Sequence, residues 1–298
     1  MNLRKMSQMI TIIPVLTIIG LLIAGGCAKN NDTISVPTGI NFAADYTSAL
    51  QLAGEKNQIM VIDFYTDWCR WCNTLDSATF HDSAVIAFSQ NMVFVRVNAD
   101  TDTLTAQKYS IHGYPTVVVA QSDGTEIDRI SGYMPPEPFM ETIQNYLQDK
   151  ETLADYLRRA DTNATIMVNY VLGDKYSSRG MNDKAVDYFQ KVIAADPDNK
   201  DSLTIDAMFS IGSILIGEKD YQKALELFDE IIVKFKGTPG AVDAVLWKGI
   251  ALRNMGDTSG AIAVFRGFLK DNPDNPDSAY ARSQIDKLVN PSPATGGK

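Results

Sequence analysis

The sequence contains little cysteine, little histidine and no excess of basic residues. Its 298 residues include three cysteines and two histidines, and 27 Lys and Arg residues are outnumbered by 36 Asp and Glu residues, which gives a net charge of −9 at pH 7. So few cysteines exclude a small fold that is held together by several disulfides. The acidic balance argues against a role in nucleic-acid binding, because affinity for the phosphate backbone depends on Lys and Arg.

The shortage of sulfur and imidazole also disfavours a metal centre or a bound haem. A zinc site needs four ligands, and Cys69 and Cys72 supply two, with only His81 and His112 left to complete the set. Covalent haem attachment requires a histidine directly after the second cysteine, and Asn73 stands there. We therefore expect no metal and no cofactor.

The N-terminus has the pattern of an export signal. Arg4 and Lys5 precede an uncharged apolar run, Met9–Ala24, which ends in Gly25-Gly26-Cys27. The last five residues, from Ile23, resemble a bacterial lipoprotein lipobox, and the resemblance implies cleavage before Cys27 and lipidation of its sulfur. An uncleaved membrane anchor and an ordinary secretory signal are the alternatives. All three predict that the rest of the chain is exported to the cell envelope.

The most informative run is a strand-like segment, Met60–Tyr65, followed closely by Trp68-Cys69-Arg70-Trp71-Cys72. A buried strand that leads into a helix would place Cys69 at the helix N-terminus. There the free backbone N–H groups and the helix dipole favour a thiolate over a thiol. We expect Cys69 to be the exposed nucleophile, and Cys72 to resolve a mixed disulfide and to close a Cys69–Cys72 disulfide.

Two charged residues are predicted to support this pair. Asp63 lies in an otherwise apolar strand, where burial would raise its pKa and let it accept the proton of Cys72. The alternative is a structural aspartate held by hydrogen bonds. Arg70 would lower the pKa of Cys69 further. We assign no chemical role to His81, His112 and Arg96.

A contact surface for a partner protein is predicted around Trp68, Arg70, Trp71, Tyr114, Pro115 and Thr116. A cis peptide bond before Pro115 would leave the adjoining backbone free to pair with an extended substrate, whereas a trans proline at a sheet edge is the alternative. Trp68 either covers the site or packs in the core. Trp71 either offers an apolar surface or packs over the sheet.

Strand and helix patterns alternate through the first half of the chain. The predicted helices cover 42–53, 69–78, 82–89, 103–109 and 137–147, and the predicted strands cover 59–65, 92–98, 116–120 and 126–130. The order, βαβ and then ββα, is typical of an α/β sandwich around a mixed sheet.

These pieces resemble the thioredoxin superfamily. The matching residues are Asp63, Trp68-Cys69-x-x-Cys72, Val97-Asn98-x-Asp100, Ile111-x-Gly113-x-Pro115-Thr116 and Gly132. Asp67-Trp68-Cys69 and the segment 79–85 are more similar to the C-terminal periplasmic domain of DsbD-type transmembrane reductases, which pass electrons outward to exported proteins. This resemblance implies a reductase, and no electron-importing domain is evident, so an external donor is needed. Arg70-Trp71 replaces the Gly-Pro of thioredoxin, and a low thiol pKa at Cys69 would instead favour an oxidant.

From residue 150 the pattern becomes helical and repeats. A glycine is followed by an alanine 12 residues later and by a phenylalanine four residues after that, at 173, 185 and 189, at 212, 224 and 228, and at 249, 261 and 265. The units resemble tetratricopeptide repeats, which implies a concave face that binds peptides or proteins. A closing helix is expected over 278–288. Four aromatic residues either line that face or pack in the core: Tyr176, Tyr188, Tyr221 and Trp247.

The sequence thus predicts an α/β thioredoxin-like sandwich followed by an all-α tetratricopeptide-repeat solenoid. The expected parts are a signal peptide (1–26), a tether (27–41), the thioredoxin-like domain (42–149), the repeats (150–290) and a disordered tail (291–298). We expect a membrane-anchored thiol–disulfide oxidoreductase that acts on protein thiols or disulfides, with an unidentified protein bound by the repeats. The alternative is a non-catalytic interaction scaffold.

Overall fold

The computed structural model describes residues 38–290. The predicted signal peptide, Cys27, most of the predicted tether and the predicted tail at 291–298 lie outside the described residues. None of the helices within 38–290 combines the length and the apolar character needed to span a membrane.

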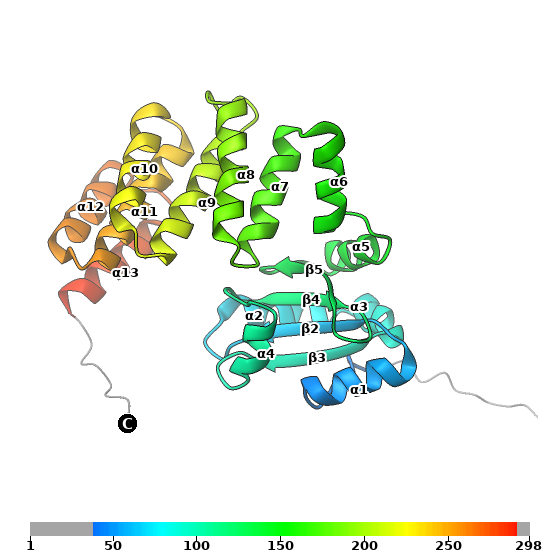
Figure 1. Cartoon of the computed structure of the whole chain (residues 1–298). Coiled ribbons are helices and arrows are strands. Elements are labelled where there is room, and N and C mark those ends of the chain that lie inside the picture. The colour runs from blue at the N-terminus through cyan, green and yellow to red at the C-terminus, as the bar shows by residue number, and fades with distance from the viewer. Residues whose placement is uncertain (1–37, 291–298) are drawn as a thin grey trace, which may run out of the picture. The chain divides into compact units, whose positions relative to one another are not determined.

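A mixed five-stranded sheet forms the centre of the N-terminal part (Figure 1). Its strands are β1 (Phe42–Ala43), β2 (Met60–Tyr65), β3 (Val93–Asn98), β4 (Thr116–Ala120) and β5 (Glu126–Ser131), in the order β1-β3-β2-β4-β5. β3 is parallel to β1 and β2, whereas β4 is antiparallel to β2 and β5. β2 is central and covered on both faces, which explains why it reads as an apolar run rather than as an alternating one.

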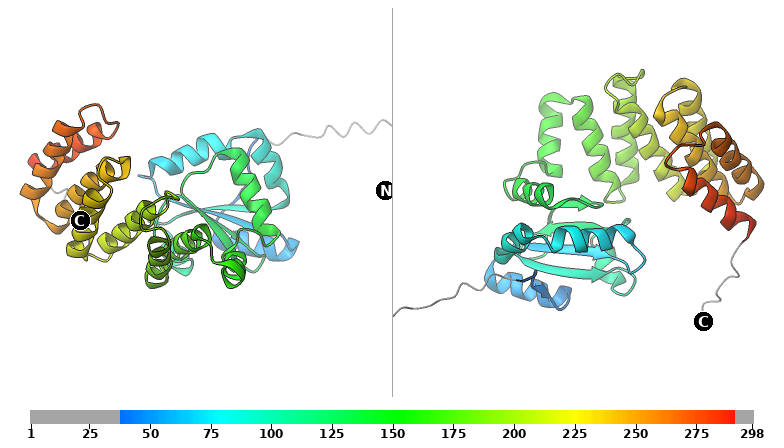
Figure 2. Two further views of the ribbon diagram at one scale, coloured as in Figure 1. Left: turned by 90° about the horizontal axis from the view of Figure 1, so that it is seen from above. Right: turned by 180° about the vertical axis from the view of Figure 1, so that it is seen from behind.

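Helices cover both faces of this sheet, as predicted. The helices are α1 (Tyr46–Lys56), α2 (Arg70–Thr74), α3 (Ser83–Phe88), α4 (Thr103–Lys108) and α5 (Pro136–Leu147). Buried residues of α1 and α4 pack on one face of the sheet, and those of α3 and α5 pack on the other. The sheet is therefore the middle layer of a three-layer sandwich (Figure 2).

Two predicted helix boundaries were wrong. Residues 42–43 form β1 rather than the start of a helix, because they pair with β3 and the ring of Phe42 packs against Phe80 and Phe94. Helix α1 begins only after Asp45, whose side chain accepts the Ser48 N–H. The helix predicted to end at residue 78 continues past α2 as a π-helical turn, Leu75–Phe80. Its wider turn lets both end residues of that segment face the core.

The C-terminal part is a series of antiparallel helices, which confirms the predicted solenoid. They are α6 (Leu153–Asn163), α7 (Ile166–Ser177), α8 (Asn182–Ala195), α9 (Thr204–Gly217), α10 (Tyr221–Lys234), α11 (Pro239–Met255), α12 (Thr258–Asp271) and α13 (Ser278–Val289). The repeated glycines allow paired helices to approach closely. A Cβ atom at Gly173, for example, would lie 2.6 Å from the ring of Phe189, and Gly212 and Gly249 have the same relation to their phenylalanines.

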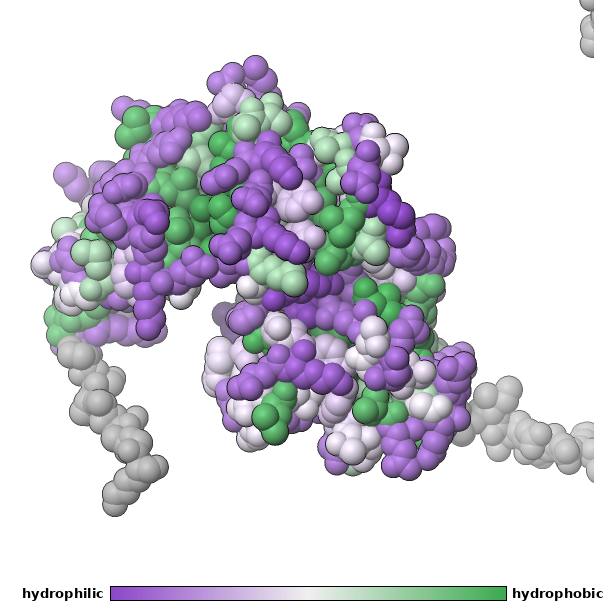
Figure 3. Space-filling view, viewed as in Figure 1, coloured by the Kyte–Doolittle hydropathy of each residue, from purple (hydrophilic) through white to green (hydrophobic). Residues whose placement is uncertain are grey.

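The four aromatic residues considered for the concave face are buried or half-buried. Tyr176 is buried and stacks on Tyr188, with ring centroids 5.6 Å apart. Tyr221 is half-buried at the first position of α10. Trp247 is half-buried, packs against Phe209 and lines a groove on the repeats. Figure 3 shows hydrophobic surface gathered over the region of α9 to α11.

Candidate active site

The two cysteines lie where β2 leads into α2, and they are joined as predicted. Their sulfur atoms are 2.06 Å apart and their Cα atoms 5.3 Å apart. Cys69 is the N-cap residue of α2, and the Cys72 backbone N–H donates to the Cys69 sulfur at 3.0 Å. Once the disulfide is reduced, this donor points at the atom on which a thiolate charge would form, so it favours that charge.

The expectation that Cys69 is exposed was wrong for the disulfide form. Cys69 is 5% exposed and Cys72 is 2% exposed. Trp68 and Trp71 beside them are, by contrast, 71% and 58% exposed. Arg70 is exposed as well. The disulfide is thus surrounded by accessible side chains without being accessible itself.

Both tryptophans lie on the surface beside the disulfide rather than in the core. The indole N–H of Trp68 donates to Asp100 Oδ2 at 3.1 Å, and its ring meets the ring of Tyr114 edge-on. Trp71 stacks on Tyr133, with ring centroids 5.8 Å apart. Trp71, Tyr114 and Tyr133, together with Gly132, line a pocket of about 280 Å³. Tyr133 was missed by sequence reasoning, because its only signal was its position next to Gly132.

The loop before β4 has the predicted cis peptide bond between Tyr114 and Pro115. Antiparallel pairing of Thr116 with Phe64 brings the loop to the end of β2 that precedes the cysteines. The Thr116 hydroxyl donates to the Gly113 carbonyl at 2.9 Å, and Thr116 is buried. Its side chain therefore holds the loop, in which Pro115 is buried as well and Tyr114 is half-buried.

Asp63 is buried, and its neighbour across the sheet is Arg96. The parallel register places the two residues side by side, and Arg96 Nε donates to Asp63 Oδ2 at 3.0 Å. Burial raises the pKa of Asp63 from 3.8 to about 6, although Arg96 opposes the shift. The other oxygen, Oδ1, is buried without a hydrogen-bond partner among the described residues. Only one of the two carboxyl oxygens therefore has a hydrogen-bond partner among the described residues.

Arg96 is the charged neighbour of Asp63 to which the sequence alone assigned no role. It also contacts Asp76 at 3.2 Å and lies over the ring of Tyr65. A usable signal was present, because Asp63 and Arg96 are the only charged residues of β2 and β3. Strand pairing and register were needed to connect them, and these come from the tertiary structure.

The remaining candidates lie apart from the disulfide. His81 is exposed, and its Nδ1 contacts the Asp76 carbonyl. His112 borders a different cleft, which faces the repeats. Residues 38–290 contain no group of three or more His, Cys, Asp or Glu side chains that could hold a metal ion.

Comparison with protein families identifies both parts of the chain. A thioredoxin-like domain model matches residues 46–147. A tetratricopeptide-repeat model matches residues 170–242 and again 209–276. The sandwich is thus a thioredoxin-like domain, and the helical part consists of tetratricopeptide repeats.

Curated relatives match the first of these parts. Thiol:disulfide interchange protein DsbD of Vibrio vulnificus (strain CMCP6) is 33% identical over 103 residues, which are 32% of this chain and 17% of that protein. The protein of the same name from Pasteurella multocida (strain Pm70) is 30% identical over 99 residues, 31% of this chain and 17% of that protein. The chain thus spans about a sixth of the length of these relatives.

Among solved structures, an oxidoreductase named DsbH is 16% identical and covers 42% of this chain and 95% of that one, with a TM-score of 0.35. The oxidised C-terminal domain of Neisseria meningitidis DsbD is 24% identical and covers 34% of this chain and 90% of that one, with a TM-score of 0.30.

Proposed function

We propose that this protein, a thioredoxin-like domain joined to tetratricopeptide repeats, is an exported thiol–disulfide oxidoreductase that reduces disulfides in partner proteins. The observation that carries the proposal is the Cys69–Cys72 disulfide at a helix N-terminus, with the Cys72 N–H directed at the Cys69 sulfur. The name thiol:disulfide interchange protein, borne by the curated relatives of this domain, supports the same chemistry.

The reaction begins with the reduced pair. The Cys69 thiolate attacks one sulfur of a partner disulfide, so that a Cys69–partner disulfide forms and the partner's second sulfur leaves as a thiolate, which takes a proton from solvent. The N–H that contacts the Cys69 sulfur stabilises the attacking thiolate. Trp68, Arg70 and Trp71 are exposed around it and offer the first contacts to the partner.

The second step releases the partner. Cys72 loses its proton to the Asp63 carboxylate, and the resulting thiolate attacks the Cys69 sulfur. The Cys69–Cys72 disulfide forms as the Cys69–partner bond breaks, and the leaving partner thiolate takes a proton from solvent. Asp63 returns its proton to solvent, and the partner leaves with both of its cysteines reduced. Two electrons have passed from the dithiol to the partner, so a dithiol donor in the envelope must reduce Cys69–Cys72 before the next cycle. A pKa of about 6 keeps Asp63 ionised, and able to accept a proton, at neutral pH.

Two further parts of the proposal concern location and recruitment. Lipidation at Cys27 would hold the protein at a membrane of the cell envelope, and Cys27→Ser should abolish incorporation of a labelled fatty acid into the protein. The repeats would recruit partner proteins, because repeat solenoids present extended binding surfaces. The half-buried Trp247 in the groove of the repeats supports that role.

The deciding experiment replaces each cysteine separately. Cys69→Ser should abolish reduction of protein disulfides, whereas Cys72→Ser should accumulate covalent mixed disulfides that non-reducing electrophoresis detects. Ser77→Ala, an exposed change on the same segment, is the control and should leave turnover unchanged. Full turnover by Cys69→Ser would sink the proposal. Full replacement of the wild type in cells by the double Cys→Ser variant would favour a non-catalytic scaffold instead.

The equilibrium potential of the Cys69–Cys72 pair decides the direction of exchange. A value near about −270 mV, as in thioredoxin, would support a reductant. A value near about −120 mV would mark an oxidant, and the search would turn to partners that arrive as free thiols.

A further inference from the structure

A cleft of about 740 Å³ opens between the loop that carries Pro115 and the first repeat helices. One wall comes from residues 112–116 and 131–132 of the thioredoxin-like domain. The opposite wall comes from the end of α7, the turn that follows it, the start of α8 and the last turn of α9. The cleft therefore continues from the loop beside the disulfide onto the repeats.

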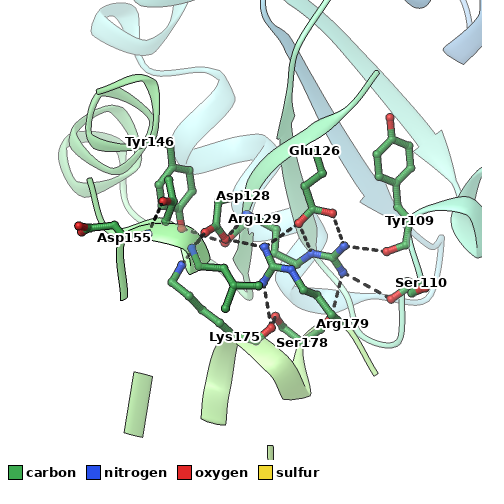
Figure 4. A network of polar contacts seen from close by, with 12 residues as sticks. Tyr109, Ser110, Glu126, Asp128, Arg129, Tyr146, Asp155, Lys175, Ser178 and Arg179 are labelled. Atoms are coloured by element: carbon green, nitrogen blue, oxygen red, sulfur yellow. Dashed lines mark hydrogen bonds and ion pairs between the residues drawn. The ribbon is translucent and has the colours of Figure 1, made fainter. Parts of the chain in front are cut away.

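Buried ion pairs hold the repeats against the edge strand β5 (Figure 4). Asp128 of β5 is fully buried and accepts from Lys175 Nζ at 3.0 Å and from Arg179 Nη2 at 2.9 Å. Arg179 also pairs with Glu126 at 2.8 Å. The Leu153 N–H at the start of α6 donates to the same aspartate. Each buried charge in this contact has an opposite charge or a hydrogen-bond donor. The contact between β5 and the repeats is therefore a specific interface.

One guanidinium group sets the position of the cleft walls. Arg129 donates to the Ser178 carbonyl at the end of α7 at 2.8 Å, and to the Tyr109 carbonyl at 2.7 Å. The second bond reaches the start of the loop that leads to Pro115. The turn after α7 also touches this loop, because a Cβ atom at Gly180 would lie only 2.2 Å from His112 Nε2. The wall formed by the repeats therefore has a fixed place beside the loop.

The lining of the cleft suits a polypeptide. Half of its residues are serine or glycine, whose small side chains leave room for the main chain of a bound segment to approach. Two carboxylates, Asp174 and Glu218, lie on the repeat wall, and neither forms an ion pair within residues 38–290. Burial raises the pKa of Asp174, and the nearby charges of Lys175 and Arg179 oppose that shift. Glu218 accepts one hydrogen bond, from Asn182 at 2.8 Å. His112 is the single basic residue of the lining.

We propose that this cleft binds the extended segment of a substrate protein that flanks its disulfide, and that Asp174 and Glu218 favour segments carrying Lys or Arg. The inference rests on the proposed function. It adds the substrate class: a disulfide on an accessible, basic stretch of chain rather than a small disulfide compound. The first repeats then act as part of the active site, and only the later repeats remain available to recruit other proteins.

The test compares two disulfides in single-turnover measurements on reduced full-length protein. One is a peptide whose cysteine is joined to thionitrobenzoate and flanked by lysines, and the other is the small symmetrical disulfide of thionitrobenzoate. Attack by Cys69 releases coloured thionitrobenzoate from both, and Cys69→Ser gives the background rate. Ser213→Trp fills the cleft from an exposed position on α9. Val233→Trp, at the 77% exposed Val233 outside the cleft, is its control.

Ser213→Trp should slow the reaction with the peptide on the order of tenfold or more. Its reaction with the small disulfide should keep the wild-type rate, and Val233→Trp should react with both substrates at the wild-type rate. The charge variant Asp174→Asn/Glu218→Gln should slow the lysine peptide about two- to fivefold and leave a glutamate-flanked peptide no slower. Its control, Glu141→Gln/Asp271→Asn, removes two exposed carboxylates elsewhere.

The outcomes separate the two proposals. Equal rates for the peptide in wild type and Ser213→Trp would overturn the cleft proposal while leaving the oxidoreductase intact. An effect of filling without any effect of charge would overturn the preference for basic segments. Failure of the wild type to react with either disulfide would overturn the proposed function, and the cleft proposal with it.

Discussion

Asp63 and Asp128 are buried aspartates in strands of one sheet, and their surroundings differ. Asp128 accepts from four donors: Arg129 N, Leu153 N, Lys175 Nζ and Arg179 Nη2. Asp63 has Arg96 on one oxygen and no hydrogen-bond partner on the other among the described residues. A buried charge is stabilised only as far as its hydrogen-bonding capacity is filled. Asp128 therefore joins β5 to the repeats, whereas the raised pKa and open oxygen of Asp63 are what the proposed role as proton acceptor requires.

The largest effect on stability should follow from removing the carboxylate of Asp128. Asp128→Ala leaves Lys175 and Arg179 buried without their shared carboxylate, and we expect the free energy of unfolding to fall by about 3–5 kcal/mol. Urea denaturation followed by circular dichroism would measure it. Asp198→Ala, at a 69% exposed carboxylate, should change stability by less than about 0.5 kcal/mol. A small loss for Asp128→Ala would show that the network contributes little to docking.

Removing the charge of Asp63 should instead raise the free energy of unfolding. The folded pKa of Asp63 is about 6 and its ordinary value is 3.8, so between these pH values the folded state binds a proton that the unfolded state has lost. Stability therefore falls as pH rises through this window. Asp63→Asn should raise the free energy of unfolding of the oxidised protein by up to about 3 kcal/mol at pH 7, and by little below pH 4. Equal stability of variant and wild type at pH 7 would contradict this.

The same substitution should impair the second chemical step. Without a carboxylate to accept the Cys72 proton, release of the partner at pH 7 should slow by about a hundredfold. Quenched-flow trapping of the mixed disulfide would measure this step. The wild-type rate should fall as pH drops below about 6, where Asp63 becomes protonated, so that variant and wild type converge. A constant ratio of the two rates between pH 5 and 8 would exclude Asp63 as the proton acceptor.

A smaller effect should distinguish Arg96, which acts on the pKa of Asp63, from the exposed Arg70. Arg96 lowers the pKa of Asp63, against the effect of burial. Arg96→Met keeps much of the side-chain volume and removes the charge, and it should move the midpoint of the pH–rate profile upward by about one pH unit. Arg70→Gln, at an exposed position, is the matched control and should leave that midpoint in place. An unmoved midpoint in Arg96→Met would mean that Asp63 does not set the profile.

Much of the site could be predicted because its residues are close in sequence or belong to strong patterns. Cys69, Cys72 and the strand before them lie within one short segment, so local structure alone brings the sulfurs together. The regular spacing of glycine, alanine and phenylalanine likewise predicted the helical repeats, whereas the contact of Gly173 with Phe189 came from the structure. Errors arose where packing overruled local preference. Phe42 was expected in a helix, yet it joins the sheet because its ring fills space between Phe80 and Phe94.

The sequence by itself determined the two kinds of fold, the cysteine pair and the buried aspartate that precedes it, because these follow from motif, period and polarity along the chain. Only the tertiary structure decided that Arg96 pairs with Asp63, that Tyr133 stacks on Trp71, and that the repeats border the loop of Pro115. These contacts depend on strand register and on the joint between β5 and α7. Both arise from burying surfaces of distant segments against each other, which no local pattern encodes.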